Sequence, residues 1–328
     1  MATTTTASNI SAATQFLQVK NDAYAYRRFG SGPGRPLLCL QHFMGTLENW
    51  DPAVTDPLAA AREVILFNNA GVGRSAGKVP ATVAGMATHA LKFLDGLGVG
   101  TCDVLGFSLG GMVAQQMARD QPFSIRRMIL VATAPRGGED IMRLEKPTLA
   151  SHLADPTLEG YAVLQKIFFA PTSSSQAAGR GFIERLAQRK KDVDPASGPD
   201  VAAAQIAAFR EWEQSTETRF GDLKNIRHPT LVVNGIHDEM IPVSNSNGWP
   251  RTFRTPYFSR TRTPDTAPSS TFTTRLPATR RHFSHRTHRS HPTESPRGEP
   301  RVPETREHQA IASRIAAGAL PDSEGGTI

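Results

Sequence analysis

The stretch Cys102–Asp120, CDVLGFSLGGMVAQQMARD, decides the fold of this chain. Its first part, CDVLGF, is a continuous apolar run, which is typical of a strand buried on both faces of a sheet. Its second part, which begins at Leu109, has the residue pattern of a helix. Between the two stands Ser108 in a Gly-x-Ser-x-Gly motif, and a tight strand-to-helix turn at this motif lifts the serine hydroxyl clear of the sheet.

The glycines of the motif, Gly106 and Gly110, fit such a turn because a strained backbone leaves room only for small neighbours. The helix that begins at Leu109 offers free N–H groups and the positive end of its dipole, which suit a negatively charged oxygen. We therefore predict that Ser108 is a nucleophile. The alternative is an ordinary strand-to-helix turn whose serine caps the helix.

The same alternation of apolar strands and helices runs through the first part of the chain. A short antiparallel start is expected at 16–19 and 23–30. Further buried strands are expected at 36–43, 63–71, 125–135 and 228–235, and helices at 49–61 and 81–97. Strands that alternate with helices predict the α/β class, here a mostly parallel, doubly wound sheet.

The alternation stops between residues 136 and 222, where the pattern is helical at 157–170, 179–192 and 200–214. The sequence thus predicts these segments: a disordered N-terminus over 1–15, a first core part over 16–135, a helical cap over 136–222, a second core part with an acidic loop over 223–248, and an irregular or disordered tail over 249–328.

Several motifs together resemble the α/β-hydrolase family, over about Phe16 to Pro242, and most of all its single-domain esterases and cofactor-free haloperoxidases. Beside GFSLGG, the segment LQHFMG is similar to the family's His-Gly-x loop, and FNNAGVGRS to its F-D-x-R-G-x-G-x-S turn, with Asn68 for Asp. VVNGIHDEMIP is similar to the loop that carries the family's catalytic acid.

The resemblance implies roles for individual residues. Ser108 would be the nucleophile, Asp238 the acid that orients a histidine, and the N–H groups of Leu109 and Phe43 the oxyanion hole; Met44 is an alternative to Phe43. A surface aspartate that caps a helix is the alternative for Asp238. A serine nucleophile favours ester-like substrates over those of the family's carboxylate-dependent epoxide hydrolases and haloalkane dehalogenases. No metal and no cofactor are implied.

The family also needs a catalytic histidine after one more strand, and none is found at the matching position. The tail has five histidines, none of which follows a strand: His282, His285, His288, His291 and His308. Without that base the activity would be lost or much reduced.

The tail from Trp249 to Ile328 has 13 Arg, no Lys and 7 acidic residues. This composition is typical of a polypeptide translated from GC-rich DNA in the wrong reading frame. The codons that this part of the chain allows, when read in the neighbouring frame, permit a strand followed by a Gly-His-Gly loop. The α/β-hydrolase family has its last strand and its histidine loop at about this place. We therefore hypothesise a frame switch near Ser246–Pro250. A native Arg/Pro-rich disordered extension is the alternative.

The formal net charge of +7 lies almost wholly in this tail, so the body is nearly neutral and no nucleic-acid-binding face is expected on it.

No apolar run is long enough to span a membrane, and the N-terminus has no signal-peptide pattern. Cys39 and Cys102 lie in strand-like runs, which fits buried thiols in a cytoplasmic protein. The expected partner is a small-molecule substrate; a non-catalytic binding protein, and nucleic-acid binding through the tail, are the alternatives.

Overall fold

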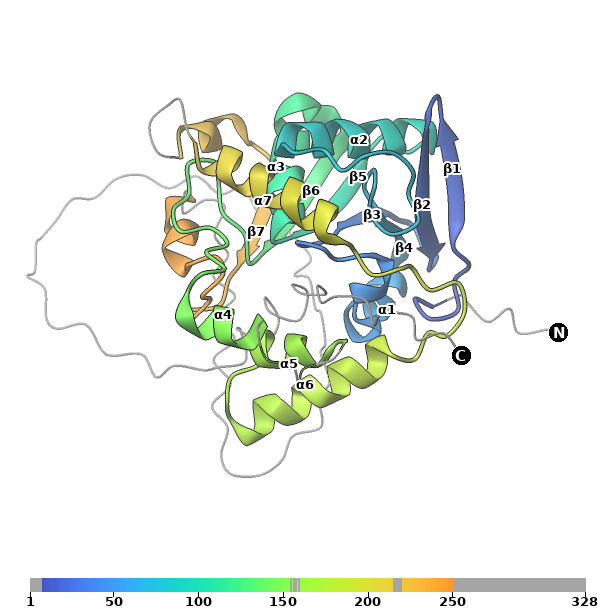
Figure 1. Cartoon of the computed structure of the whole chain (residues 1–328). Helices are drawn as coiled ribbons and strands as arrows, with labels where there is room; N and C mark the ends of the chain where they lie inside the picture. The colour runs from blue at the N-terminus through green and yellow to red at the C-terminus, as the bar shows by residue number, and fades with distance from the viewer. Residues whose placement is uncertain (1–7, 154, 156–157, 159, 215–219, 250–328) are drawn as a thin grey trace, which may run out of the picture. The chain divides into compact units, whose positions relative to one another are not determined.

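The computed structural model describes residues 8–249, apart from residues 154, 156–157, 159 and 215–219. In this part, seven strands form one sheet in the order β1-β2-β4-β3-β5-β6-β7 (Figure 1). The strands are β1 (Gln15–Val19), β2 (Asp22–Phe29), β3 (Gly34–Leu40), β4 (Arg62–Phe67), β5 (Cys102–Phe107), β6 (Ile125–Val131) and β7 (Thr230–Val233). The pairs β1/β2 and β2/β4 are antiparallel and the other four are parallel, which confirms the predicted mostly parallel α/β sheet.

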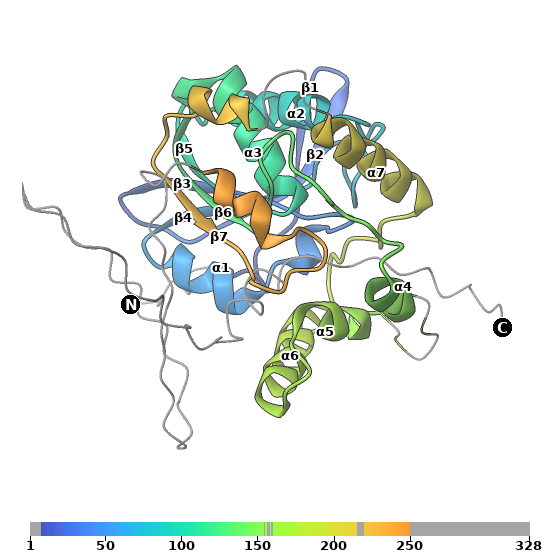
Figure 2. The same ribbon diagram turned by 90° about the vertical axis from the view of Figure 1, so that its left-hand side faces the viewer.

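Helices lie on both faces of this sheet. They are α1 (Pro52–Ala59), α2 (Val83–Gly96), α3 (Leu109–Asp120), α4 (Pro147–Leu153), α5 (Ala162–Phe168), α6 (Ser173–Leu186) and α7 (Pro199–Glu213). Short 3-10 turns are η1 (Leu47–Asn49), η2 (Pro122–Ser124), η3 (Gly221–Asn225) and η4 (Val243–Gly248). In Figures 1 and 2, α2, α3 and α7 lie on one side of the sheet, and α1, α5 and α6 on the other.

The central strands supply alternate residues to two apolar cores. In β3, Leu38 and Leu40 pack with α2, α3 and α7, whereas Leu37 and Cys39 pack with α1, α5 and α6. Successive side chains of a strand point to opposite faces, so a strand covered on both sides must be apolar throughout. This is why the continuous apolar runs identified the central strands so clearly.

Helices α4 to α7 all lie between β6 and β7, where the sequence predicted a helical insertion. The pattern missed α4, which is only seven residues long. It also placed α6 six residues too late, because Gly179 looked like a start and is instead an interior residue. A side chain at Gly179 would lie 3.0 Å from the ring of Phe169, so glycine allows α5 and α6 to pack closely. The helix begins after Thr172, whose hydroxyl accepts the N–H of Ser175 (3.3 Å).

A buried polar cluster fixes the segment between α6 and α7 to the sheet. Glu48 is paired with Arg27, and it also accepts the N–H of Asp194 (2.9 Å). The Asp194 carboxylate in turn accepts Nδ2 of Asn68 (2.6 Å), and burial raises the pKa of Asp194. An aspartate at 68, the residue found in the family motif, would set two carboxylates against each other here. The asparagine therefore suits this cluster.

The first described residues are also packed against the body. Asn9 is buried and donates to the carbonyl oxygen of Trp50 (2.8 Å), and Arg189 donates to that of Ile10 (2.7 Å). The predicted disorder over 1–15 therefore does not extend to residues 8–14, since their backbone has partners in the body. The predicted tail over 249–328, with its histidines, lies outside the described residues except for Trp249. The proposed frame switch near Ser246–Pro250 falls at the last described residues, in and just after η4.

The fold at α3 depends on glycine at one position that can be tested by substitution. A Cβ on Gly110 would overlap the carbonyl oxygen of Leu40, a backbone atom that cannot move aside. We expect Gly110→Ala to lower the free energy of unfolding by about 2–3 kcal/mol, although alanine is the better helix former. The measurement is urea denaturation.

The matched control is Gly100→Ala, because nothing lies within 4 Å of a Cβ built there. Its free energy of unfolding should stay within about 0.5 kcal/mol of the original chain. Equal stability of the two variants would contradict the close contact between α3 and β3.

Candidate active site

Ser108 stands between β5 and α3 in a backbone conformation that non-glycine residues rarely adopt, with φ 51° and ψ −117°. Hydrogen bonds on both sides hold it there. Its N–H donates to the carbonyl oxygen of Val131 (2.8 Å), and its own carbonyl oxygen accepts the hydroxyl of Thr133 (2.7 Å). The Ser108 side chain makes no capping hydrogen bond to α3, so the alternative of a simple capping serine does not hold.

The two motif glycines are required by space. A Cβ on Gly106 would lie 2.5 Å from the carbonyl oxygen of Gly110, and Gly110 itself is pressed against Leu40 at the end of β3. The neighbouring Gly111 faces Thr133, whose side-chain atoms would lie 2.7 Å from an added Cβ. The N-terminus of α3 is therefore held tightly against the ends of β3, β5 and β6.

The sequence predicts two oxyanion donors, one at the start of α3 and one in the loop after β3. Leu109 is the first residue of α3, so its N–H has no partner within the helix. Phe43, the predicted second donor, is buried next to Met44, which has a left-handed φ of 61°. The N–H of Met44 donates to Oε1 of Gln205 in α7 (2.6 Å). Gln205 could not be identified from the sequence, because a single glutamine on an amphipathic helix carries no functional signal.

His42 in the same loop is a buried, neutral residue. Its Nδ1 lies 2.7 Å from the carbonyl oxygen of Phe43, and because a carbonyl can only accept, Nδ1 carries the proton. Burial lowers the pKa of His42 to about 3. The ring packs edge-on against Phe107, with centroids 5.6 Å apart. His42 thus fixes the shape of the loop.

Asp238 follows β7 at the same edge of the sheet as Ser108. Strands β5, β6 and β7 are parallel neighbours, so their carboxyl ends, with Ser108 after β5 and Asp238 after β7, face one way. Oδ1 of Asp238 accepts the N–H groups of Met240 (2.9 Å) and Ile241 (2.8 Å). Desolvation raises the pKa of Asp238 from 3.8 to about 7, against the effect of these two hydrogen bonds.

Within the described residues, no hydrogen bond joins the carboxylate of Asp238 to Ser108 or to a histidine, although His237 is its neighbour in the chain. His89 lies 2.7 Å from the hydroxyl of Tyr24, and His228 lies 2.8 Å from the carbonyl oxygen of Pro122. An imidazolium close to this carboxylate would lower its pKa, and the groups that act on the pKa of Asp238 include no histidine. Among the described residues, no histidine is therefore hydrogen-bonded to Asp238 as the resemblance implies.

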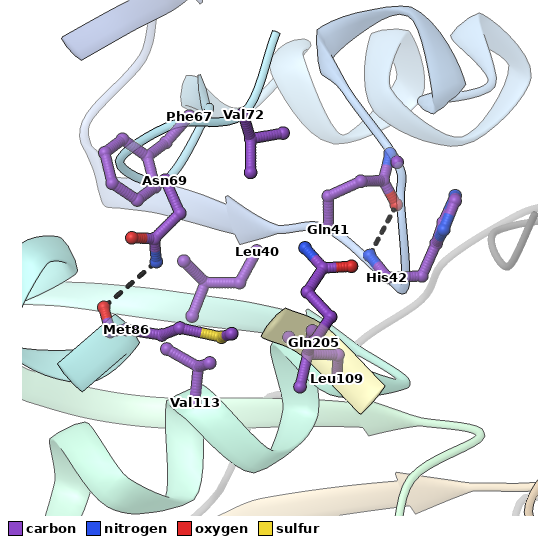
Figure 3. A pocket seen from close by; sticks show the side chains of 12 residues that line it. Leu40, Gln41, His42, Phe67, Asn69, Val72, Met86, Leu109, Val113 and Gln205 are labelled. Atoms are coloured by element: carbon purple, nitrogen blue, oxygen red, sulfur yellow. Dashed lines mark hydrogen bonds between the residues drawn. The ribbon is translucent and has the colours of Figure 1, made fainter. Parts of the chain in front are cut away.

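A small cavity of about 30 Å³ adjoins the loop after β3, enough for about one water molecule. It is lined by residues from β3, β4, α2, α3 and α7, namely Leu40, Gln41, His42, Gly45, Phe67, Asn69, Val72, Met86, Leu109, Gly110, Val113 and Gln205. Figure 3 shows Gln205 beside Leu40 and Gln41 at this cavity. The N-terminus of α3 and the loop after β3 therefore line the same cavity.

In the described part of the chain, His, Cys, Asp and Glu do not gather in groups of three that could hold a metal ion. Of the helices in the same residues, none is long and apolar enough to cross a bilayer.

Comparison with known proteins identifies the family. The family model described as alpha/beta hydrolase fold matches residues 35–265. A solved alpha/beta hydrolase fold protein from Chitinophaga pinensis is 38% identical, with a TM-score of 0.67, and the match covers 74% of this chain and 86% of that one.

Two curated bacterial relatives have named activities. RutD of Caulobacter sp. (strain K31), provisionally named a carbamate hydrolase, is 29% identical over 60% of this chain and 70% of its own. The dihydrolipoyllysine-residue acetyltransferase component of the acetoin cleaving system of Cupriavidus necator is 36% identical over 73% of this chain and 61% of its own. With the family model matched over most of the chain and the strained turn at Ser108, this chain belongs to the α/β hydrolase fold family.

Proposed function

We propose that this chain is built to hydrolyse a small ester-like substrate, with Ser108 as the nucleophile. The observation that carries the proposal is the backbone of Ser108, whose strained turn leaves the hydroxyl free of any capping bond to α3. Strain of this kind costs about 1–3 kcal/mol and persists where the surrounding structure enforces it, most often at functional sites.

The reaction follows from the parts of the site. Oγ of Ser108 would attack the acyl carbon, and its proton would pass to a base. The carbonyl oxygen would become an oxyanion, held by the N–H of Leu109 and by one from the Phe43–Met44 loop. The bond to the leaving group would then break as that group takes up the proton. Water would hydrolyse the acyl-serine and regenerate the hydroxyl.

Asp238 is the proposed acid that orients the base. Its Oδ1 is fixed by the N–H groups of Met240 and Ile241, so the carboxyl group has a defined direction. The relatives support an acyl substrate, because carbamate hydrolysis and acetyl transfer both take place at a carbonyl carbon. The insertion that holds α4 to α7 is proposed to be the cap over the substrate, since Gln205 of α7 contacts the oxyanion loop.

A second candidate is a non-catalytic binding protein that retains the site without a working base. The observation in its favour is that no described histidine is hydrogen-bonded to Asp238. Binding of a short-chain ester without any turnover, in the chain as it stands, would distinguish this function from hydrolysis.

The proposed hydrolase can be tested by restoring the missing base. We expect that replacing residues 249–328 with the neighbouring-frame reading, which permits a strand and a Gly-His-Gly loop, raises kcat on p-nitrophenyl acetate on the order of 10⁴–10⁶-fold. A triad without its histidine loses about that much.

In the restored protein, Ser108→Ala should remove the gain, whereas Ser124→Ala, on the η2 turn, should keep it. Release of p-nitrophenol, followed at saturating ester, is the measurement. A restored protein no more active than the original, or a gain that survives Ser108→Ala, would count against the proposed mechanism.

The raised pKa of Asp238 has a consequence for stability. The folded chain keeps this carboxyl protonated up to about pH 7, whereas the unfolded chain loses the proton near pH 3.8. Between these values the folded state binds more protons, so this group lowers stability as the pH rises. Asp238→Asn cannot ionise, and its Oδ1 can still accept both N–H groups.

We therefore expect Asp238→Asn to match the original chain near pH 4 and to become more stable than it toward pH 7. The gain is about 1.4 kcal/mol for each pKa unit of the shift. Urea denaturation at several pH values measures it, with Asp95→Asn, at an exposed position of α2 that does not act on Asp238, as the control. A difference that does not change with pH would show that the carboxyl of Asp238 is not desolvated.

A further inference from the structure

Helix α7 rests directly on the loop that holds the second oxyanion donor. The N–H of Met44 donates to Oε1 of Gln205 (2.6 Å), and the ring of Phe43 lies 5.9 Å from that of Phe209 between centroids. Gln205 and Phe209 are four residues apart, so they lie on one face of α7. Both residues of the loop are therefore contacted by the same helix face.

The chemistry of the Met44 contact is unambiguous. An N–H can only donate, so the atom it meets is the carbonyl oxygen of the Gln205 carboxamide. Gln205 is only 4% exposed, and solvent is largely excluded from the bond. To accept the same N–H in the proposed reaction, an acyl oxygen would have to take the place of this neutral carbonyl oxygen.

We propose that Gln205 is a positioning residue that occupies the N–H of Met44 in the free protein and gives it up to the substrate oxygen as negative charge develops. This inference rests on the proposed function. Hydrogen bonds to a charged oxygen are about twice as strong as those between neutral groups. An oxyanion therefore displaces the carboxamide oxygen, whereas a neutral ester carbonyl gains little by doing so.

The structure provides room for this exchange. Gln205 lines the cavity of about 30 Å³ beside the loop, and within the described residues nothing accepts from its Nε2. Turning the carboxamide into this space breaks only the bond to Met44. The exchange makes Met44, rather than the predicted Phe43, the second donor, and it favours the transition state over the neutral substrate.

Two substitutions of opposite effect test the inference. In Gln205→Leu the N–H of Met44 is free, and in Gln205→Glu a charged oxygen of the same reach holds it more strongly. The probe is phenylboronic acid, which forms a tetrahedral anionic adduct with a serine hydroxyl. We expect the Kd of phenylboronic acid to fall about fivefold in Gln205→Leu, because the adduct no longer has to displace one ordinary hydrogen bond. In Gln205→Glu we expect this Kd to rise about tenfold, because the charged oxygen is harder to displace.

The matched control is Gln176→Leu, which removes a carboxamide that bonds the backbone of Phe169 and Ala170 inside the same insertion. Its Kd should equal that of the original chain. ¹⁵N-methionine labelling gives a second measurement, with the Met44 amide assigned through Met44→Leu. That amide signal should move when boronate binds the original chain, and should be shifted already in ligand-free Gln205→Leu.

The outcomes separate the two claims. If Ser108→Ala leaves boronate binding unchanged, the proposed function fails. If binding depends on Ser108 but both Gln205 variants shift the Kd in the same direction, or neither shifts it, then Gln205 is merely structural and this inference alone is overturned.

Discussion

The close approach of α3 to the end of β3 is the constraint on which the site depends. Gly110 touches the backbone of Leu40, and Gly106 touches the backbone of Gly110, so the chain has to reverse within the one residue between β5 and α3. Ser108 takes the positive φ that this reversal demands. The same contact sets the N–H of Leu109 beside the loop that follows β3. Backbone packing thus places the hydroxyl and its nearest amide together without help from any substrate.

Much of this could be predicted from the sequence because the decisive signals are local. Strands buried on both faces have to be continuously apolar, as Leu37–Leu40 are, and a nucleophile turn has to be flanked by glycines, as Ser108 is. The α/β class and the family followed from these. Inside the insertion the signals were weaker. α4 is too short to show a period, and the start of α6 was misplaced because Gly179 allows close packing inside the helix and does not mark its start.

The parts of the site that could not be predicted depend on contacts between distant segments. The bond from Met44 to Gln205 joins residues 161 positions apart, and nothing in either segment announces it. The choice between Phe43 and Met44 as donor was open for the same reason. Asn68 is a similar case: as a departure from the family motif it said little, but beside the buried carboxylate of Asp194 it replaces a repulsion with a hydrogen bond.

The most direct test of the account is the free energy of unfolding of Ser108→Gly compared with that of the original chain. Glycine adopts φ 51° and ψ −117° without strain, so relief of the strained turn should make the variant more stable by about 1–2 kcal/mol. In an ordinary helix-capping turn the same change would cost a few tenths of a kcal/mol instead. A variant no more stable than the original chain would contradict the claim that the fold holds Ser108 under strain.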